Sequence, residues 1–132
     1  MNTKESAIPS VTQFKEALLA LRPLDDTQMK MLRAHYLAAE HRLTATQLAE
    51  AAGSSSHSTT NLHYGKLGRA VGAYLSFQPP QQNTDGSPLY TSVIASGEPG
   101  LGIADAAHYV WTMRPELVAA LSELPWGFKP KI

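Results

Sequence analysis

The sequence has no cysteine and no surplus of charge of either sign. Eleven basic side chains balance eleven acidic ones, so the net charge is zero when histidine is neutral. The absence of cysteine excludes disulfide bonds and thiolate metal sites. No apolar run is long enough to cross a bilayer, and the first ten residues lack the apolar stretch of a signal peptide. We therefore expect a cytoplasmic protein with no membrane partner.

The sequence does contain enough apolar residues for one folded domain. They make up 43% of a chain of 132 residues, which suffices for a modest core. We expect a flexible N-terminus over residues 1–10, a single domain over 11–124 and a C-terminal tail over 125–132. The expected fold class is α+β and mostly helical, with four N-terminal helices, a β-hairpin and a C-terminal helix.

Two helices are predicted in the first third of the chain. Apolar residues recur at helical spacing over 11–21, which predicts a helix with one buried face, and Pro23 ends it. A second helix is predicted over 24–39. Asp25 and Asp26 suit its N-terminus, because the helix dipole favours negative charge there.

The second half of the chain predicts a hairpin and one more helix. Residues 78–88 are rich in proline, glycine and polar side chains and are typical of a loop. Residues 89–96 have the β-branched and aromatic content of a strand, 97–102 read as a turn, and 107–113 predict a second strand that pairs back. A final apolar period predicts a helix over 116–124.

Residues 43–75 predict a helix, a turn and a longer helix. Thr44 or Thr46 caps the first helix, and Gly53 ends it because glycine adopts left-handed backbone angles at little cost. Residues 54–58 form the turn. Small alanines let the second helix cross the first closely, as in a helix-turn-helix whose second helix enters the DNA major groove. The cap of this second helix is expected among Ser58, Thr59 and Thr60.

The pattern Leu-Ala-x-x-Ala-Gly over residues 48–53 resembles the first helix and turn of many bacterial helix-turn-helix proteins. The sequence then departs from that family, because Ser54 and Thr59 replace apolar residues of the tight-turn version. The serine-rich turn is more similar to a winged helix, which implies that the hairpin is a wing. Residues 44–53 and 61–69 also resemble a domain found ahead of HNH nuclease modules in some bacterial proteins. This resemblance implies a link to a restriction or nuclease system.

The longer helix carries an unusual stripe of small residues. Gly65, Gly68 and Gly72 share one stripe with Asn61, and each glycine costs roughly 1 kcal/mol against alanine. Close approach of the backbone to DNA or to a partner protein would offset this cost, as would a neighbouring helix of the same domain. The core side of the helix is expected to consist of Leu67, Ala70, Val71 and Tyr74.

The second helix and the turn before it supply the candidate DNA contacts. Hydroxyl groups at its start are expected to donate to phosphates, Asn61 to bond an adenine edge, and the two basic residues to contact phosphates. A tyrosine at the position of Tyr64 is more often a half-buried packing residue than a DNA contact, and residues 54–58 are also open to interpretation as a flexible solvated turn. The predicted DNA-binding residues are Ser56, His57, Ser58, Thr60, Asn61, Tyr64, Lys66 and Arg69.

Enzyme-like signals are weak. Residues 96–104 have glycines of a phosphate-binding loop, but Ile103 and Ala104 replace the lysine and hydroxyl that the chemistry needs. A hairpin turn explains this segment better. The five histidines show no metal-ligand spacing. We therefore expect no catalytic residue, no metal and no cofactor.

Two main hypotheses follow, with a small enzyme as a third. The first is a domain that binds duplex DNA through the second helix and the wing. The second is a protein-interaction module, or a small inhibitor or accessory protein with the same fold. The zero net charge argues against DNA, whose partners usually carry a basic surplus. Against this, residues 43–77 carry Lys66 and Arg69 and only one acid, Glu50. The sequence leaves the oligomeric state open.

Overall fold

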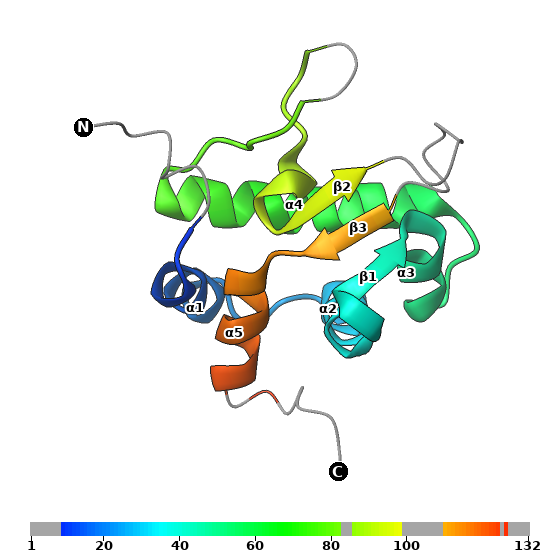
Figure 1. Cartoon of the computed structure of the whole chain (residues 1–132), viewed down its shortest axis with the longest axis horizontal. Helices are drawn as coiled ribbons and strands as arrows, with labels where there is room; N and C mark the ends of the chain where they lie inside the picture. The colour runs from blue at the N-terminus through cyan, green and yellow to red at the C-terminus, as the bar shows by residue number, and fades with distance from the viewer. Residues whose placement is uncertain (1–8, 83–85, 99–109, 125, 127–132) are drawn as a thin grey trace.

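The computed structural model describes residues 9–82, 86–98, 110–124 and 126, which form an α+β, mostly helical fold (Figure 1). This fold class and the number of helices before the sheet strands β2 and β3 agree with the prediction. The predicted flexible segment over 1–10 and the tail over 125–132 lie mostly outside the described residues. Within the described residues the α-helices are α1 (Val11–Ala20), α2 (Asp26–Leu37), α3 (Ala45–Ala51), α4 (His57–Leu75) and α5 (Pro115–Glu123).

The first three helices begin at capping boxes. The side chains of Ser10, Asp25 and Thr44 each accept a hydrogen bond from the backbone N–H of a glutamine three residues on, and that glutamine bonds back to the cap. These reciprocal bonds satisfy N–H groups that the helix itself leaves without partners. Of the two predicted caps of α3, Thr44 is the one that acts.

The start of α4 differs from the prediction. Gly53 follows the C-cap of α3 and adopts left-handed backbone angles, with φ at 87°, as expected. The cap of α4 is Ser56, whose hydroxyl accepts from the N–H of Ser58, and the helix begins at His57. The prediction of a cap at residues 58–60 is therefore wrong, because Ser56 satisfies the helix start one turn earlier.

Three short strands form an antiparallel sheet in the order β1-β3-β2. They are β1 (Arg42–Thr44), β2 (Ala95–Glu98) and β3 (Val110–Met113), and Trp111 of β3 lies opposite both Leu43 and Gly97. The sequence analysis missed β1, which is too short to show a period. The predicted hairpin is corrected to antiparallel pairing of β2 with β3 in a three-stranded sheet. The segment that joins these two strands lies outside the described residues.

The predicted strand over 89–96 is wrong in its first half. Tyr90–Val93 form a 3-10 helix, η3, and only the residues from Ala95 onward are a strand. Local side-chain bonds explain the difference, since they compete with strand pairing. The Ser92 hydroxyl donates to the Leu89 carbonyl at 2.6 Å, and the Arg114 guanidinium donates to the Ser92 carbonyl at 2.7 Å.

A buried histidine joins three parts of the core. His35 of α2 is fully buried, with Nδ1 3.0 Å from the Tyr64 hydroxyl of α4 and Nε2 2.8 Å from the Trp111 carbonyl of β3. Burial lowers the pKa of His35 to about 4, so the ring is neutral at pH 7. Nε2 then donates to the carbonyl, and Nδ1 accepts from the hydroxyl.

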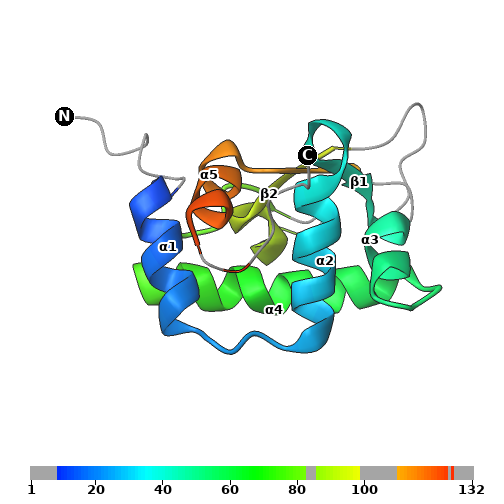
Figure 2. The same cartoon turned by 90° about the horizontal axis from the view of Figure 1, so that it is seen from below.

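Helices α1 and α2 pack on the same side of α4 (Figure 2). Figure 2 shows α1 and α2 crossing the same side of α4, with α5 between them in that view. Both α1 and α2 contact α4, and α1 also packs on α5. Trp126 folds back against the core formed by these helices. Among the described residues, no helix combines the length and apolarity that a bilayer crossing needs.

Candidate nucleic-acid interface

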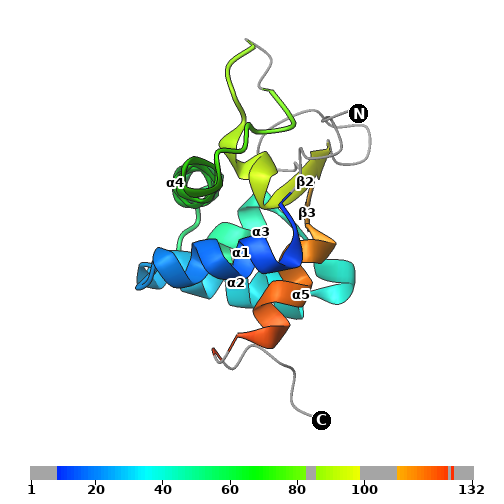
Figure 3. The same ribbon diagram turned by 90° about the vertical axis from the view of Figure 1, so that its left-hand side faces the viewer.

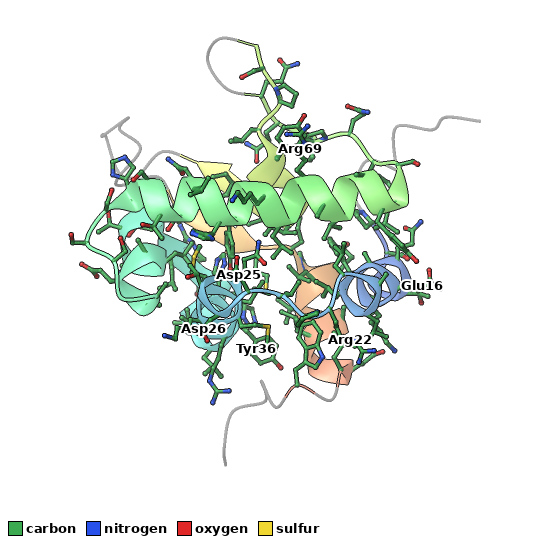
Figure 4. The ribbon with its side chains drawn as sticks, turned by 180° about the vertical axis from the view of Figure 1, so that it is seen from behind. Glu16, Arg22, Asp25, Asp26, Tyr36 and Arg69 are labelled. Atoms are coloured by element: carbon green, nitrogen blue, oxygen red, sulfur yellow. The ribbon has the colours of Figure 1, made fainter. Side chains whose placement is uncertain are left out.

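Helix α4 lies at the margin of the molecule and has an inner and an outer face. Figure 3 shows it end-on, with the sheet and the other helices to one side of it. Figure 4 shows the outer face turned toward the viewer along the full length of the helix. The inner face is buried through Thr60, Tyr64, Leu67, Gly68, Val71 and Gly72.

The glycine stripe packs inside the domain. A Cβ atom on Gly68 would lie 2.0 Å from the Tyr90 carbonyl oxygen, and one on Gly72 would lie 2.9 Å from the Phe77 carbonyl oxygen. Only glycine admits backbone this close. At Gly65 the nearest atom would be 4.0 Å away, so this glycine has room for a side chain. Two of the three glycines are therefore explained by contact with η3 and the chain that follows α4, without an external partner.

Two predicted DNA contacts are corrected. Thr60 and Tyr64 are both fully buried. The Thr60 hydroxyl donates to the Ala45 carbonyl of α3 at 2.6 Å, and the Tyr64 hydroxyl bonds to His35. Their polar groups are satisfied within the protein, as buried polar groups usually are. The prediction that they touch DNA is wrong. Tyr64 is a packing residue, and it is fully buried rather than half-buried.

The remaining hydroxyls at the start of α4 pair with one another. The Ser56 hydroxyl lies 2.6 Å from that of Ser58, and the Ser54 hydroxyl lies 2.7 Å from that of Thr59. Ser56 and Ser58 are exposed, while His57 is half-buried. These bonds link the turn to the first residues of α4.

Of the predicted contacts in α4, Lys66 and Arg69 share the outer face, whereas Asn61 lies on the side of the glycine stripe, about 140° from Lys66 around the helix axis. Asn61, Lys66 and Arg69 are all exposed. The Arg69 guanidinium lies over the Tyr90 ring, 5.5 Å from its centroid, and this cation–π contact orients the side chain. No acidic residue occurs in α4, so the face carries a local positive charge on a neutral protein. Tyr74 was expected on the core side but is 52% exposed.

An acidic residue borders this face. The Asp25 carboxylate at the start of α2 lies 3.5 Å from Nδ1 of His63 on α4. Figure 4 shows Asp25 directly beside α4, with Asp26 farther down the same end of α2. Asp26 itself pairs with Lys30 at 3.0 Å. Any phosphate-binding track along α4 is therefore bounded by negative charge on its α2 side.

Within the described residues, no three histidine or carboxylate side chains lie close enough to hold a metal ion. A pocket of about 200 Å³ lies at the C-terminal end of α4 and is lined in part by Arg69 and Tyr90.

Sequence reasoning missed one residue of the outer face. Leu62 is 53% exposed in the second turn of α4. It precedes Lys66 by four residues and Arg69 by seven, so a helical projection places the three on one face. This spacing in the sequence would have identified Leu62 as a residue of the outer face.

Comparison with known proteins adds no relative. The chain matches no protein-family model, no curated protein and no solved structure. The functional argument therefore depends on the geometry of α4 and of the elements around it.

Proposed function

We propose that this protein binds duplex DNA as a winged helix-turn-helix domain, with the N-terminal half of α4 in the major groove. The order of the elements supports the proposal. Helix, short strand, two further helices and two more strands follow one another from α2 to β3, and the sheet order is β1-β3-β2. In helix-turn-helix domains the second helix of the motif is the one that reads base edges.

The observation that carries the proposal is the exposed part of α4. Lys66 and Arg69 lie on its outer face, Asn61 is exposed in its first turns, and the helix contains no acidic side chain. Asparagine pairs with two positions of adenine in the major groove, and the two cations suit flanking phosphates. Ser56 and Ser58 stand at the helix start, where hydroxyls and N–H groups commonly meet a phosphate.

The charge balance sets the expected strength. With a net charge of zero and Asp25 at the border of the face, long-range attraction to DNA is weak. We therefore expect modest affinity that depends on low salt, and specificity that depends on direct base contacts. Association with bacterial DNA also places the protein in the cytoplasm.

The test is a set of three single variants measured against a panel of duplexes. Asn61→Ala is expected to weaken binding to the preferred duplex by about 1–3 kcal/mol and to relax specificity at one base. Lys66→Ala is expected to weaken binding to all duplexes about equally. Fluorescence anisotropy at low salt measures both effects.

Arg22→Ala is the matched control for charge. Arg22 is exposed and lies beyond the end of α1, on the opposite side of α4 from Arg69 in Figure 4. It removes one positive charge, as Lys66→Ala does, so its affinity is expected to stay close to that of the parent. Equal losses for Arg22→Ala and Lys66→Ala would show that only net charge matters, and α4 would not be the reading element.

A protein-interaction module is the second candidate, and one observation favours it. Tyr74 is 52% exposed near the C-terminal end of α4. Exposed tyrosines are common at protein interfaces. Absence of duplex binding even at low salt would support this candidate and a role as a small accessory protein or inhibitor.

A further inference from the structure

The most exposed large apolar side chain among the described residues lies on the proposed reading face. Leu62 is 53% exposed, whereas Tyr64, Leu67 and Val71 of the same helix are buried. Leu62 follows Asn61 directly and shares its face with Lys66. The side chain follows the proposed base-reading residue in sequence, projects about 100° from it around the helix axis, and takes no part in the core.

The major groove offers an aliphatic side chain one apolar feature. Donors and acceptors line the edges of all four bases, and only thymine adds a methyl group, at C5. A leucine placed among base edges gains free energy from that methyl and gains nothing from the polar edges. 5-Methylcytosine presents the same C5 methyl group in the same groove.

We propose that Leu62 is a specificity-determining residue that contacts a pyrimidine C5 methyl group, next to an adenine bonded by Asn61. This inference depends on the proposed function, because it requires the N-terminal half of α4 to enter the groove. It assigns the protein a preference for A·T pairs whose thymine methyl is intact. A C5-methylated cytosine at the same place satisfies the same contact.

The test removes the methyl group and leaves every hydrogen bond in place. The probes are a 20-base-pair alternating dA-dT duplex and the same duplex with deoxyuridine for thymidine. Burying one methyl group corresponds to an affinity change of about three- to fivefold. The parent protein is therefore expected to bind the dA-dT duplex about three- to fivefold more tightly than the dA-dU duplex.

Two variants isolate the contribution of Leu62. Leu62→Ala is expected to bind both duplexes equally, at the affinity of the parent for dA-dU, and to keep the melting temperature because the side chain is exposed. Lys66→Ala is expected to bind both more weakly and to keep the ratio between them. A second pair of duplexes, alternating dG-dC with cytosine or with 5-methylcytosine, identifies the source of the methyl group. Preference within the dA-dT pair, with or without preference in the second pair, supports the inference. Preference in the second pair alone, which contains no adenine, would overturn it.

Equal binding within both pairs would overturn the inference while leaving the proposed function standing. A methyl preference that persists in Leu62→Ala would also overturn it, because another residue would then make the contact. If the protein bound none of the four duplexes at low salt, the proposed function would be overturned, and this inference with it.

Discussion

The two faces of α4 differ in burial although they belong to one helix. The inner face holds glycine where the Tyr90 carbonyl approaches and buries Tyr64 against His35. The outer face carries Lys66 and Arg69, which are exposed, as is Asn61 near the start of the helix. The Arg69 guanidinium lies over the Tyr90 ring.

The comparison separates residues that fold the domain from residues free to bind. Substitutions on the inner face are expected to change stability and to leave any surviving folded protein competent for DNA. Substitutions on the outer face are expected to weaken DNA binding and to leave the stability of the fold unchanged. Variants of one core residue and of one matched residue outside the core test this division.

The largest expected effect is at Gly68. Gly68→Ala places a Cβ 2.0 Å from the Tyr90 carbonyl oxygen, so η3 must move away from α4. We expect a loss of about 3 kcal/mol or more in the free energy of unfolding. Gly65→Ala is the matched control, because its nearest neighbour would be 4.0 Å away. It is expected to stabilise the protein by up to about 1 kcal/mol through helix propensity.

Urea unfolding of the two glycine variants gives the difference directly. If Gly68→Ala were as stable as Gly65→Ala, η3 would not pack on α4 as described. The division of the helix into two faces would then have no basis at its C-terminal half.

The next effect is a loss of stability in acid caused by His35. Its pKa is about 4 in the folded protein and 6.5 in the unfolded chain, so the unfolded state binds more protons between these values. Stability is therefore unaffected by His35 above pH 6.5 and falls as the pH drops from 6.5 to 4. The full loss is about 3 kcal/mol, because each pKa unit is equivalent to about 1.4 kcal/mol.

Proton NMR of the histidine rings measures this prediction without a variant. The His35 ring signal is expected to stay constant down to about pH 5, and His57→Gln is expected to leave it unchanged. Titration of His35 near pH 6.5 would show that the ring is open to water and would remove the link between α2, α4 and β3.

The smallest effect compares two hydroxyls that are two residues apart in α4, one exposed and one buried. Thr60→Val removes the bond to the Ala45 carbonyl and is expected to cost about 1 kcal/mol of stability. Ser58→Ala acts on the exposed side and is expected to change stability by less than about 0.5 kcal/mol. In duplex binding the order reverses, with a small loss for Ser58→Ala and none for Thr60→Val. Equal effects of the two variants in both measurements would contradict the division.

The helices and their ends were largely predictable from the sequence, because their signals are local. Helical periods, the cap at Thr44 and the left-handed Gly53 act within a few residues of one another. The strand prediction over 89–96 failed because Ser92 and Arg114, 22 residues apart, hold this segment as a 3-10 helix. Three residues of β1 gave no period, and their pairing depends on a distant strand.

The candidate site was predictable only in part, and for a similar reason. The position of a residue in α4 places it on a helix face, but the sequence does not say which face meets the core. Thr60 and Tyr64 have the polar groups of DNA contacts and are nevertheless buried. The Thr60 hydroxyl donates a hydrogen bond to the Ala45 carbonyl, and the Tyr64 hydroxyl donates one to the His35 ring. Leu62 has the character of a core residue and is nevertheless exposed.

The salt dependence of duplex binding tests the outer face of α4 most directly. If Lys66 contacts a phosphate, the slope of log affinity against log salt concentration should become less steep by about 0.9 in Lys66→Ala. The slope of Arg22→Ala should equal that of the parent protein. A parent protein that binds no duplex at low salt, or a Lys66→Ala slope identical to the parent's, would contradict the claim that this face binds DNA.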